Sequence, residues 1–395
     1  MASNPYSIKW GILATGGIAQ TFTKDLLTNP ATRNVSDIHH EVVAAASSSS
    51  TSRAEQFLKD VKAPSGAKAY GSYAELVKDP NVDIIYVATP HSHHFQNTML
   101  CLEAGKHVLC EKAFTVNAAQ AKKLVDTAKA KKLFLMEAVW TRYFPLSIKI
   151  REMVKDGVIG KVHRVTADLS LPEAKEDGSL NFAPEHRMVN MDLAGGCLLD
   201  LGIYSLTWIF QILYHCQAQK QREQPKVLAA INKYELTGAD ESTSMLLQWP
   251  GQNTMGIATT SLRVGTTPDG EGSSAAGPAC RIQGTKGEIQ VIGPLYRPTR
   301  YRVIMVGGEK GKFEEVQCPI PADKDRDGTG HGMFWEADEA ARCIRDGKLE
   351  SDGLNWEESV VIMETMDEVR KQGGLKYPEL IETDVYDPKS PLNGK

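Results

Sequence analysis

The chain has 395 residues, of which 42% are hydrophobic and 24% are charged, and its formal net charge is −4. This balance is that of an ordinary soluble protein of two or three domains with a large core. Lysine and arginine are interleaved with acidic residues, so the sequence predicts no extended basic face and no nucleic-acid partner.

Targeting and cysteine patterns also exclude several classes of protein. The first eight residues contain one lysine and no apolar core, and no apolar run has transmembrane length, so we expect a cytoplasmic protein without a membrane partner. The seven cysteines are dispersed and form no CxxC pair, which argues against a disulfide framework and a zinc ribbon. We interpret them as buried thiols.

The first third of the chain alternates short apolar runs with helix-like segments, which predicts βαβ units and a parallel sheet. The run at residues 84–88 is apolar on both faces, as in a parallel strand that helices cover on both sides. Asn117 and Gln120 form a capping-box pattern that predicts the start of a helix. The expected strands are residues 8–13, 41–46, 83–88, 107–110 and 133–136.

The turn after the first expected strand occupies the place of a dinucleotide fingerprint. Gly16 stands where the backbone approaches a pyrophosphate, and the helix behind it offers free amides. Ala14 replaces the first glycine of the pattern, so a purely structural turn is the alternative. The residues expected to contact a dinucleotide here are Ala14, Thr15, Gly16, Gly17 and Ile18.

The second expected strand is followed by residues 47–53, with the sequence SSSSTSR, and not by an acidic residue. A carboxylate at this point would bind the ribose hydroxyls of NAD and would repel a 2′-phosphate. Six hydroxyl groups and an arginine favour NADP, with Ser48, Ser49 and Arg53 as contacts. A serine-rich linker without a binding role is the alternative.

The strand at residues 83–88 leads into Thr89-Pro90 and three histidines, His91, His93 and His94. No Asp, Glu or Cys lies at ligand spacing, and three histidines within four residues cannot easily surround one ion, so we predict no metal site. We expect Thr89 and Pro90 to form a rigid turn beneath a nicotinamide, with His91 and His94 near its ribose or amide.

Glu111 and Lys112 follow the strand at residues 107–110. They place a carboxylate and an ammonium at the carboxyl end of a parallel strand, where open sheets bind ligands. We expect both to contact the cofactor, and Lys112 is the first catalytic candidate. A surface Glu/Lys pair is the alternative.

After residue 142 the pattern changes to longer helices and strands with hairpin signals. Gly307 and Gly308 can supply the positive φ of a tight turn, so this half predicts a largely antiparallel sheet. Residues 265–277 are rich in Gly and Ser and predict a mobile loop. Expected helices are residues 144–156, 197–214 and one capped by Asn355 with Glu358; expected strands are residues 161–169, 226–233, 243–249, 254–262 and 301–306.

These motifs together resemble the glucose-fructose oxidoreductase/inositol dehydrogenase (Gfo/Idh/MocA) family. The resemblance includes the fingerprint, the Ala88-Thr89-Pro90 turn with His94, Glu111-Lys112, and the segment GGCLLDLGIY at residues 195–204. The segments MEAVWTRYFP at 136–145 and LAGG at 193–196 are similar to the branch of dimeric dihydrodiol dehydrogenases and fungal NADP-dependent D-xylose 1-dehydrogenases.

The resemblance implies an N-terminal Rossmann domain over residues 1–140 that binds NADP. It also implies a C-terminal α/β domain over residues 141–395, with an open, mainly antiparallel sheet for substrate binding and homodimerisation. The expected reaction is oxidation of D-xylose at C1 to its lactone. Oxidation of trans-dihydrodiols or other aldoses is an alternative, and a non-catalytic NADP(H) sensor is an alternative of another class. Ala113 replaces the proline that usually follows Glu-Lys, which removes no functional group.

Asp200 and Tyr204 are four residues apart, so they share one face of the expected helix. Many relatives have histidine at the second position. A phenol with a pKa near ~10 is a poor base at neutral pH, and a nearby ammonium favours its ionised form. We expect Tyr204 to be the general base, Lys112 its electrostatic partner, and Asp200 an orienting or substrate-binding group.

The other possibility for this helix is a core tyrosine with a helix-capping aspartate. Trp140 and Arg142 are expected to form a substrate wall, and Trp140 as an ordinary core residue is the alternative.

Overall fold

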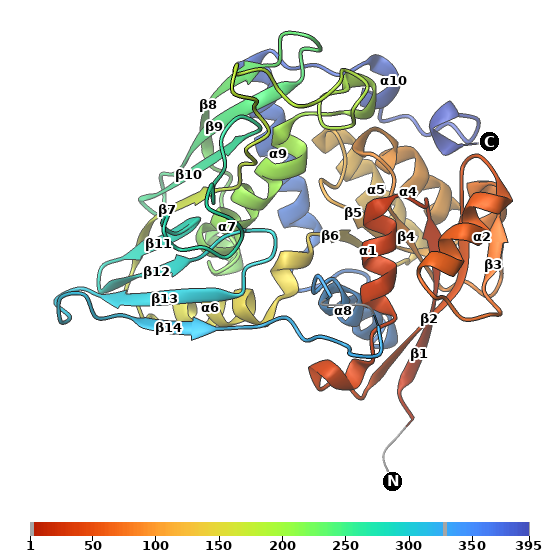
Figure 1. Ribbon diagram of the computed structural model, residues 1–395, viewed down its shortest axis with the longest axis horizontal. Helices are drawn as coiled ribbons and strands as arrows, with labels where there is room; N and C mark the ends of the chain where they lie inside the picture. Colours follow the sequence, from red (N-terminus) through yellow and green to blue (C-terminus); the bar gives the residue numbers. More distant parts are fainter. Residues whose placement is uncertain (1–3, 327–329, 395) are drawn as a thin grey trace. The chain divides into compact units, whose positions relative to one another are not determined.

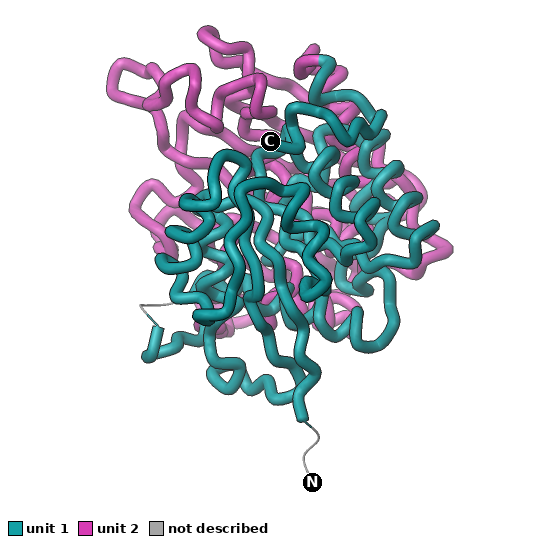
Figure 2. Tube along the Cα trace, turned by 90° about the vertical axis from the view of Figure 1, so that its right-hand side faces the viewer, with its two compact units in different colours: residues 1–140, 320–360, 379–395 teal, residues 141–319, 361–378 magenta. Residues whose placement is uncertain are grey.

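The computed structural model describes residues 4–326 and 330–394. The chain divides into two compact units, which Figure 2 colours separately. Unit 1 comprises residues 1–140, 320–360 and 379–395, and unit 2 comprises residues 141–319 and 361–378. A boundary after residue 140 was expected. The expected second domain, however, included residues 320–360 and 379–395, and both segments belong to unit 1.

Unit 1 is built on a six-stranded sheet in the order β3-β2-β1-β4-β5-β6, visible in Figure 1. Every neighbouring pair is parallel, which is the doubly wound arrangement of a dinucleotide-binding fold and confirms the predicted fold class. The short β3 was not predicted. The strands are β1 (Tyr6–Leu13), β2 (Ile38–Ala46), β3 (Lys68–Tyr70), β4 (Ile84–Val87), β5 (His107–Glu111) and β6 (Leu135–Ala138).

The helices of unit 1 connect these strands, and two of the predicted caps are confirmed. The Asn117 side chain accepts a hydrogen bond from the Gln120 amide at 2.9 Å, and Asn355 accepts one from the Glu358 amide at 2.9 Å. The helices are α1 (Gly17–Leu26), α2 (Thr51–Asp60), α3 (Tyr73–Leu76), α4 (His94–Glu103), α5 (Ala118–Lys131), α8 (Phe334–Arg345) and α10 (Glu379–Glu382); α9 (Trp356–Gly373) continues into unit 2.

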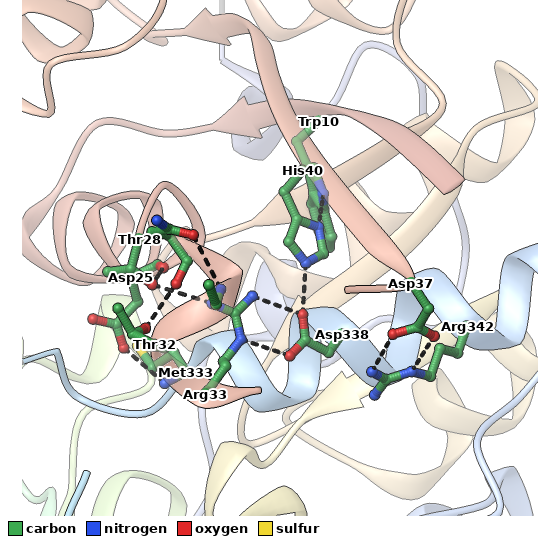
Figure 3. A network of polar contacts seen from close by, with 12 residues as sticks. Trp10, Asp25, Thr28, Thr32, Arg33, Asp37, His40, Met333, Asp338 and Arg342 are labelled. Carbon is green, nitrogen blue, oxygen red and sulfur yellow. Dashed lines mark hydrogen bonds and ion pairs between the residues drawn. The ribbon is translucent and has the colours of Figure 1, made fainter. Parts of the chain in front are cut away.

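A buried polar network explains why the segment that contains α8 folds with unit 1 (Figure 3). Both Asp338 oxygens accept hydrogen bonds from the Arg33 guanidinium, at 2.7 and 2.8 Å, and His40 Nε2 lies 2.9 Å from Asp338 Oδ1. The indole N–H of Trp10 donates to His40 Nδ1 at 3.1 Å, so the imidazole proton is on Nε2 and points to Asp338. The network thereby joins β1, β2 and α8.

Unit 2 contains an eight-stranded sheet in the order β14-β13-β12-β11-β7-β10-β9-β8. Only β7 and β10 pair in parallel, so the sheet is mainly antiparallel, as predicted. The predicted strands did not include β11, β12 or β14. The strands are β7 (Val162–Asp168), β8 (Lys226–Lys233), β9 (Asp240–Trp249), β10 (Thr254–Ser261), β11 (Cys280–Gly284), β12 (Gly287–Val291), β13 (Arg300–Met305) and β14 (Glu314–Gln317).

Two helices of unit 2 were also predicted. The first is α6 (Pro145–Lys155). The second begins with a π-helical turn, η5 (Leu198–Gly202), and continues as α7 (Ile203–Leu213), every residue of which is buried. The stretch Met191–Leu213 is long and apolar enough to cross a membrane, although no such run was expected. Because 94% of its most apolar window is buried inside the protein, we interpret it as a core helix.

Candidate active site

A cavity of about 450 Å³ lies in unit 1 at the carboxyl ends of β1, β2 and β4. This is the edge at which open parallel sheets bind their ligands. The expected cofactor residues that line it are Ala14, Thr15, Gly16, Ser48, Arg53, Thr89 and Pro90. The other expected contacts, which are not part of this lining, are Gly17, Ile18, Ser49, His91, His94, Glu111 and Lys112.

The fingerprint turn has the backbone geometry that a dinucleotide requires. Ala14 adopts a φ of +91°, a conformation that glycine tolerates and alanine rarely adopts, so the fold keeps the requirement for glycine although the sequence has lost it. At Gly16 an added Cβ would meet no protein atom within 4 Å, which leaves open space in front of the first turn of α1. Backbone amides at this helix start suit the pyrophosphate of a dinucleotide.

The serine turn after β2 is organised by its own side chains. Ser47 and Ser49 share a hydrogen bond of 3.1 Å, and Ser50 caps α2 by accepting from the Arg53 amide at 3.3 Å. The Arg53 guanidinium is exposed and lies 3.4 Å from Ser49 Oγ. An exposed cation beside ordered hydroxyl groups fits a phosphate.

Five residues of the cavity lining were not identified from the sequence: Gln20, Gln56, Phe57, Asp60 and Tyr73. Asp60 is at the end of α2, and its carboxylate accepts a hydrogen bond from Gln56 at 2.7 Å. Burial raises the pKa of Tyr73, and a hydrogen bond with Ser48 partly offsets this increase. These residues follow no motif, so only the folded chain reveals their place in the lining.

His94 joins two loops of the site. Its ring is buried, with Nδ1 2.8 Å from the Ala113 carbonyl oxygen and Nε2 2.9 Å from the Thr89 carbonyl oxygen. Burial lowers the pKa of His94 to about 4, so the ring is neutral at pH 7 and only one nitrogen donates. The ring braces the turn after β4 against the loop after β5, and the expected place of His94 near the nicotinamide ribose or amide remains a prediction.

Lys112 follows β5 on a loop that is fixed on several sides. The Tyr86 hydroxyl donates to Glu111 Oε1, and the Lys112 amide donates to Glu111 Oε2 at 3.1 Å. Two residues after Lys112, the Phe114 amide donates a hydrogen bond to Glu137 of β6 at 3.0 Å. The peptide bond between Lys112 and Ala113 is cis. Glu111 is therefore buried and supports the Lys112 backbone, so it does not belong to a surface Glu/Lys pair.

Asp200 and Tyr204 lie in unit 2 at the junction of η5 and α7. Asp200 is on the π-helical turn and Tyr204 on the first turn of α7. π-helical turns are rare and often occur at functional sites. Both side chains are buried, and Asp200 Oδ2 is 3.4 Å from the Arg187 guanidinium. Lys112 belongs to unit 1, so its approach to Tyr204 remains a prediction.

Asp240 anchors the start of this helix, a role that no sequence pattern indicated. It is fully buried on β9, and its Oδ2 accepts hydrogen bonds from the Leu198 amide at 2.6 Å and from Cys197 Sγ at 3.1 Å. A Cβ at Gly196 would lie 1.9 Å from Asp240 Oδ1, so only glycine fits there. Gly196, just before the helix, therefore makes room for its anchor.

An aromatic residue of unit 2 lies beside Tyr204. The rings of Tyr204 and Tyr296 are 6.1 Å apart, and the Tyr296 hydroxyl donates to Glu271, which belongs to the Gly/Ser-rich loop. Arg297 also binds Glu271, at 3.2 Å. Tyr296 was not identified from the sequence, and the two contacts tie the loop to the neighbourhood of Tyr204.

Trp140 and Arg142 are both buried, at 4% and 0% exposure. Trp140 is in unit 1, where its ring centroid is 6.2 Å from that of His331, and Arg142 is in unit 2, where its carbonyl oxygen accepts a hydrogen bond from Arg151 at 2.9 Å. Their expected role as a substrate wall remains a prediction.

Two family models match the chain. The model "Oxidoreductase family, NAD-binding Rossmann fold" matches residues 8–139, which include all of sheet β3-β2-β1-β4-β5-β6 except the start of β1. The model "GFO/IDH/MocA C-terminal domain" matches residues 147–290, which include the helix that carries Asp200 and Tyr204.

Named relatives and solved structures agree with this match. The chain is 65% identical to the D-xylose 1-dehydrogenase (NADP(+)) of Hypocrea jecorina over all of this chain and 99% of that protein. It is 36% identical to the human trans-1,2-dihydrobenzene-1,2-diol dehydrogenase over 94% of this chain and 99% of that protein. The aldose-aldose oxidoreductase of Caulobacter crescentus has the same fold, with a TM-score of 0.72, 19% identity and coverage of 93% and 98% of the two chains. The chain therefore belongs to the GFO/IDH/MocA oxidoreductase family.

Proposed function

We propose that this chain is an NADP-dependent D-xylose 1-dehydrogenase that oxidises C1 of the sugar to D-xylonolactone. The observation that carries the proposal is the 65% identity, over the whole chain, to the Hypocrea jecorina enzyme of that name. The serine turn and Arg53 beside the cavity of unit 1 support NADP, because they present hydroxyl groups and a cation with no carboxylate at the end of β2.

In this proposal the cavity of unit 1 holds the dinucleotide. Ala14, Thr15 and Gly16 face its pyrophosphate, and Ser48 and Arg53 face its 2′-phosphate. Thr89 and Pro90 support the nicotinamide end. NADP, when bound, supplies the acceptor for the hydride that leaves C1 of the sugar.

The residues of the chain supply proton transfer and orientation. The Tyr204 oxygen takes the proton of the anomeric hydroxyl as the C1–O bond becomes a carbonyl, and the Lys112 ammonium stabilises the phenolate form of Tyr204. Asp200 orients the sugar by binding the sugar hydroxyl groups. Trp140 and Arg142 form one wall of the substrate site. Correct positioning of the two reactants contributes most of the acceleration.

We assign cofactor binding to unit 1, including residues 320–360 and 379–395, and substrate binding and dimerisation to unit 2. The open face of the sheet in unit 2 supports a homodimer. Leu228, Leu246 and Ile257 are aligned across β8, β9 and β10, and Leu228 and Ile257 are 67% and 38% exposed. An apolar stripe of this kind favours burial against a second copy. Sedimentation velocity measures the oligomeric state directly, and we expect a dimer. We also expect the protein to be located in the cytoplasm.

A panel of aldoses with each cofactor, followed by the absorbance of the reduced cofactor, tests the function. We expect the highest kcat/KM with D-xylose and NADP. A higher kcat/KM with NAD would contradict the assignment of the serine turn, and a higher value with trans-dihydrodiols of aromatic hydrocarbons would move the chain to the other branch of the family. NADP binding without turnover of any substrate would favour a sensor.

A further inference from the structure

The segment that ends unit 1 is fixed along two helices by four carboxamide side chains. From α4, Gln96 donates to the Val385 carbonyl oxygen at 2.9 Å and accepts from the Asp387 amide at 3.1 Å. Asn97, also on α4, donates to the Leu392 carbonyl oxygen at 2.9 Å and to Asn393 Oδ1 at 3.1 Å.

Two side chains at the start of α5 repeat this pattern. Gln120 donates to the carbonyl oxygens of Ile381 and Thr383, at 2.8 and 2.9 Å. The N-capping residue Asn117 donates to the Glu382 carbonyl oxygen at 2.9 Å. All four carboxamides bind the main chain of residues 379–394, which we call the C-terminal strap.

Burial makes these contacts costly to break. Gln96, Asn97 and Gln120 are 2% exposed or less, so a detached strap would leave buried amide groups without partners. The strap is also fixed to itself, because Ser390 caps the short helix η7 (Pro391–Asn393) and the Asn393 side chain donates to the Asp387 carbonyl oxygen at 3.0 Å. The strap is therefore an integral part of unit 1.

The end of the strap contacts two residues that line the cavity of unit 1. Gly394 packs against the serine turn after β2: a Cβ on Gly394 would lie 3.0 Å from Ser48 Cβ and 3.4 Å from Tyr73 Cδ2. Ser48 and Tyr73 both line the cavity. Gly394 also has a φ of +73°, which strains any other residue.

We propose that the C-terminal strap is a positioning element for recognition of the NADP 2′-phosphate, with Gly394 fixing Ser48 from behind. The inference rests on the proposed function, since it assumes that the cavity of unit 1 holds NADP. Ser48 is one of three expected 2′-phosphate contacts, and its hydroxyl can be placed correctly only if the backbone of the serine turn is held. Gly394 supplies that support from a point more than three hundred residues away in the sequence.

Gly394→Val in the full-length protein is the main test. The added side chain must displace either the strap or Ser48, so we expect the Kd of NADP to rise by about 10-fold, the range of a lost hydrogen bond to a charged group. The Kd of NAD, which lacks the 2′-phosphate, should change by less than about 2-fold. With saturating cofactor, kcat should be unchanged.

Gly105→Val is the matched control. Gly105 is in the same unit and has a φ of +79°, but an added Cβ there would meet nothing within 4 Å. The control therefore imposes the same kind of backbone strain without touching the serine turn. Its Kd values for NADP and NAD should equal those of the wild type.

Asn393→Ala is a second, milder variant. It removes the side chain that joins η7 to Asn97 and Asp387 but introduces no bulk. We expect a smaller increase in the NADP Kd, again without an effect on NAD. Fluorescence titration with each cofactor in the absence of sugar measures all of these constants.

The outcomes separate this inference from the proposed function. If wild-type protein fails to bind NADP, the proposed function fails. If wild type binds NADP and Gly394→Val binds both cofactors as wild type does, only the strap proposal is overturned. Equal losses for NADP and NAD would also overturn it, because they would indicate a general structural role.

Discussion

The two units fix their functional groups in different ways. In unit 1, the residues of the cavity lining that the sequence predicted follow β1, β2 and β4, so the sheet itself brings them to one edge. In unit 2, Asp200 and Tyr204 lie on a helix whose start is anchored by Asp240, forty residues further along the chain. The first arrangement is local and leaves a motif in the sequence. The second has a motif at residues 195–204, but it also depends on Asp240, a distant side chain that no motif indicated.

This difference has a consequence for function. The parallel sheet determines where the cofactor cavity forms, and loop residues adjust which cofactor it suits. The position of Tyr204 is determined by one buried carboxylate and a glycine that makes room for it. We therefore expect substitutions in unit 1 to separate binding from chemistry, and substitutions at the helix anchor in unit 2 to affect stability and turnover together.

The largest expected effect is that of Lys112→Met. Loss of the ammonium removes the charge that stabilises the Tyr204 phenolate, so we expect kcat to fall by about 10³-fold. Circular dichroism should match that of the wild type, because the fold stays intact. Lys129→Met, at an exposed position on α5, is the control and should be fully active. Near-normal turnover of Lys112→Met would show that Lys112 is not a catalytic residue.

Tyr204→Phe should lower kcat by about 10²-fold or more while NADP affinity changes little, because the phenol takes a proton and does not bind cofactor. Tyr234→Phe, at another buried tyrosine of unit 2, is the control. The double variant Lys112→Met/Tyr204→Phe tests whether these residues of the two units act together. If the two groups act together, its loss will be much smaller than the product of the single losses. Independent losses would count against their meeting at one reaction centre.

Asp240→Ala tests the anchor of the helix in unit 2. It leaves the buried Leu198 amide without its acceptor, so we expect the free energy of unfolding to fall by about 1–3 kcal/mol. Because the helix start is released, kcat should fall as well. Asp240→Asn keeps an acceptor oxygen and should restore most of both properties. A stable but inactive Asp240→Ala would mean that Asp240 acts in the chemistry and not as an anchor.

The sequence predicted most strands because they have local signatures. The candidate site residues of both units also lie in local motifs, and their roles remain predictions. The alternation of apolar runs indicated the parallel sheet, and the place of Ser48 and Arg53 after β2 indicated the NADP pocket. The network of Arg33, His40 and Asp338 was not predicted, because its members are paired only by the tertiary fold. For the same reason no sequence pattern indicated that residues 320–360 pack with unit 1.

His94 provides a pH test of the brace in unit 1. Its folded pKa of about 4 is below the ordinary histidine value of 6.5, so the unfolded chain binds more protons between these pH values. Stability from this group is complete above pH 6.5 and is lost as the pH falls toward 4, by about 2 kcal/mol at about pH 5.

Other buried groups titrate in the same range. Burial also lowers the pKa of His93 to about 4 and lowers that of His40, which gives the same sign, whereas burial raises the pKa of Asp25 to about 6, which gives the opposite sign. Urea unfolding of His94→Gln, compared with the exposed control His163→Gln, isolates the His94 contribution. A doubly protonated ring that donates to both carbonyls would instead make wild type gain stability as the pH falls.

The smallest effect concerns the fingerprint turn. Ala14 holds a φ of +91°, which costs about 1–3 kcal/mol for a residue other than glycine. Ala14→Gly removes this strain but increases the entropy of the unfolded chain, so we expect a net gain of about 1 kcal/mol in the free energy of unfolding. Ala130→Gly, at an exposed position in α5, should instead lose up to about 1 kcal/mol. Opposite signs at the two positions would show that the backbone at position 14 still favours glycine although alanine occupies it. Equal losses would mean that the Ala14 conformation is not strained.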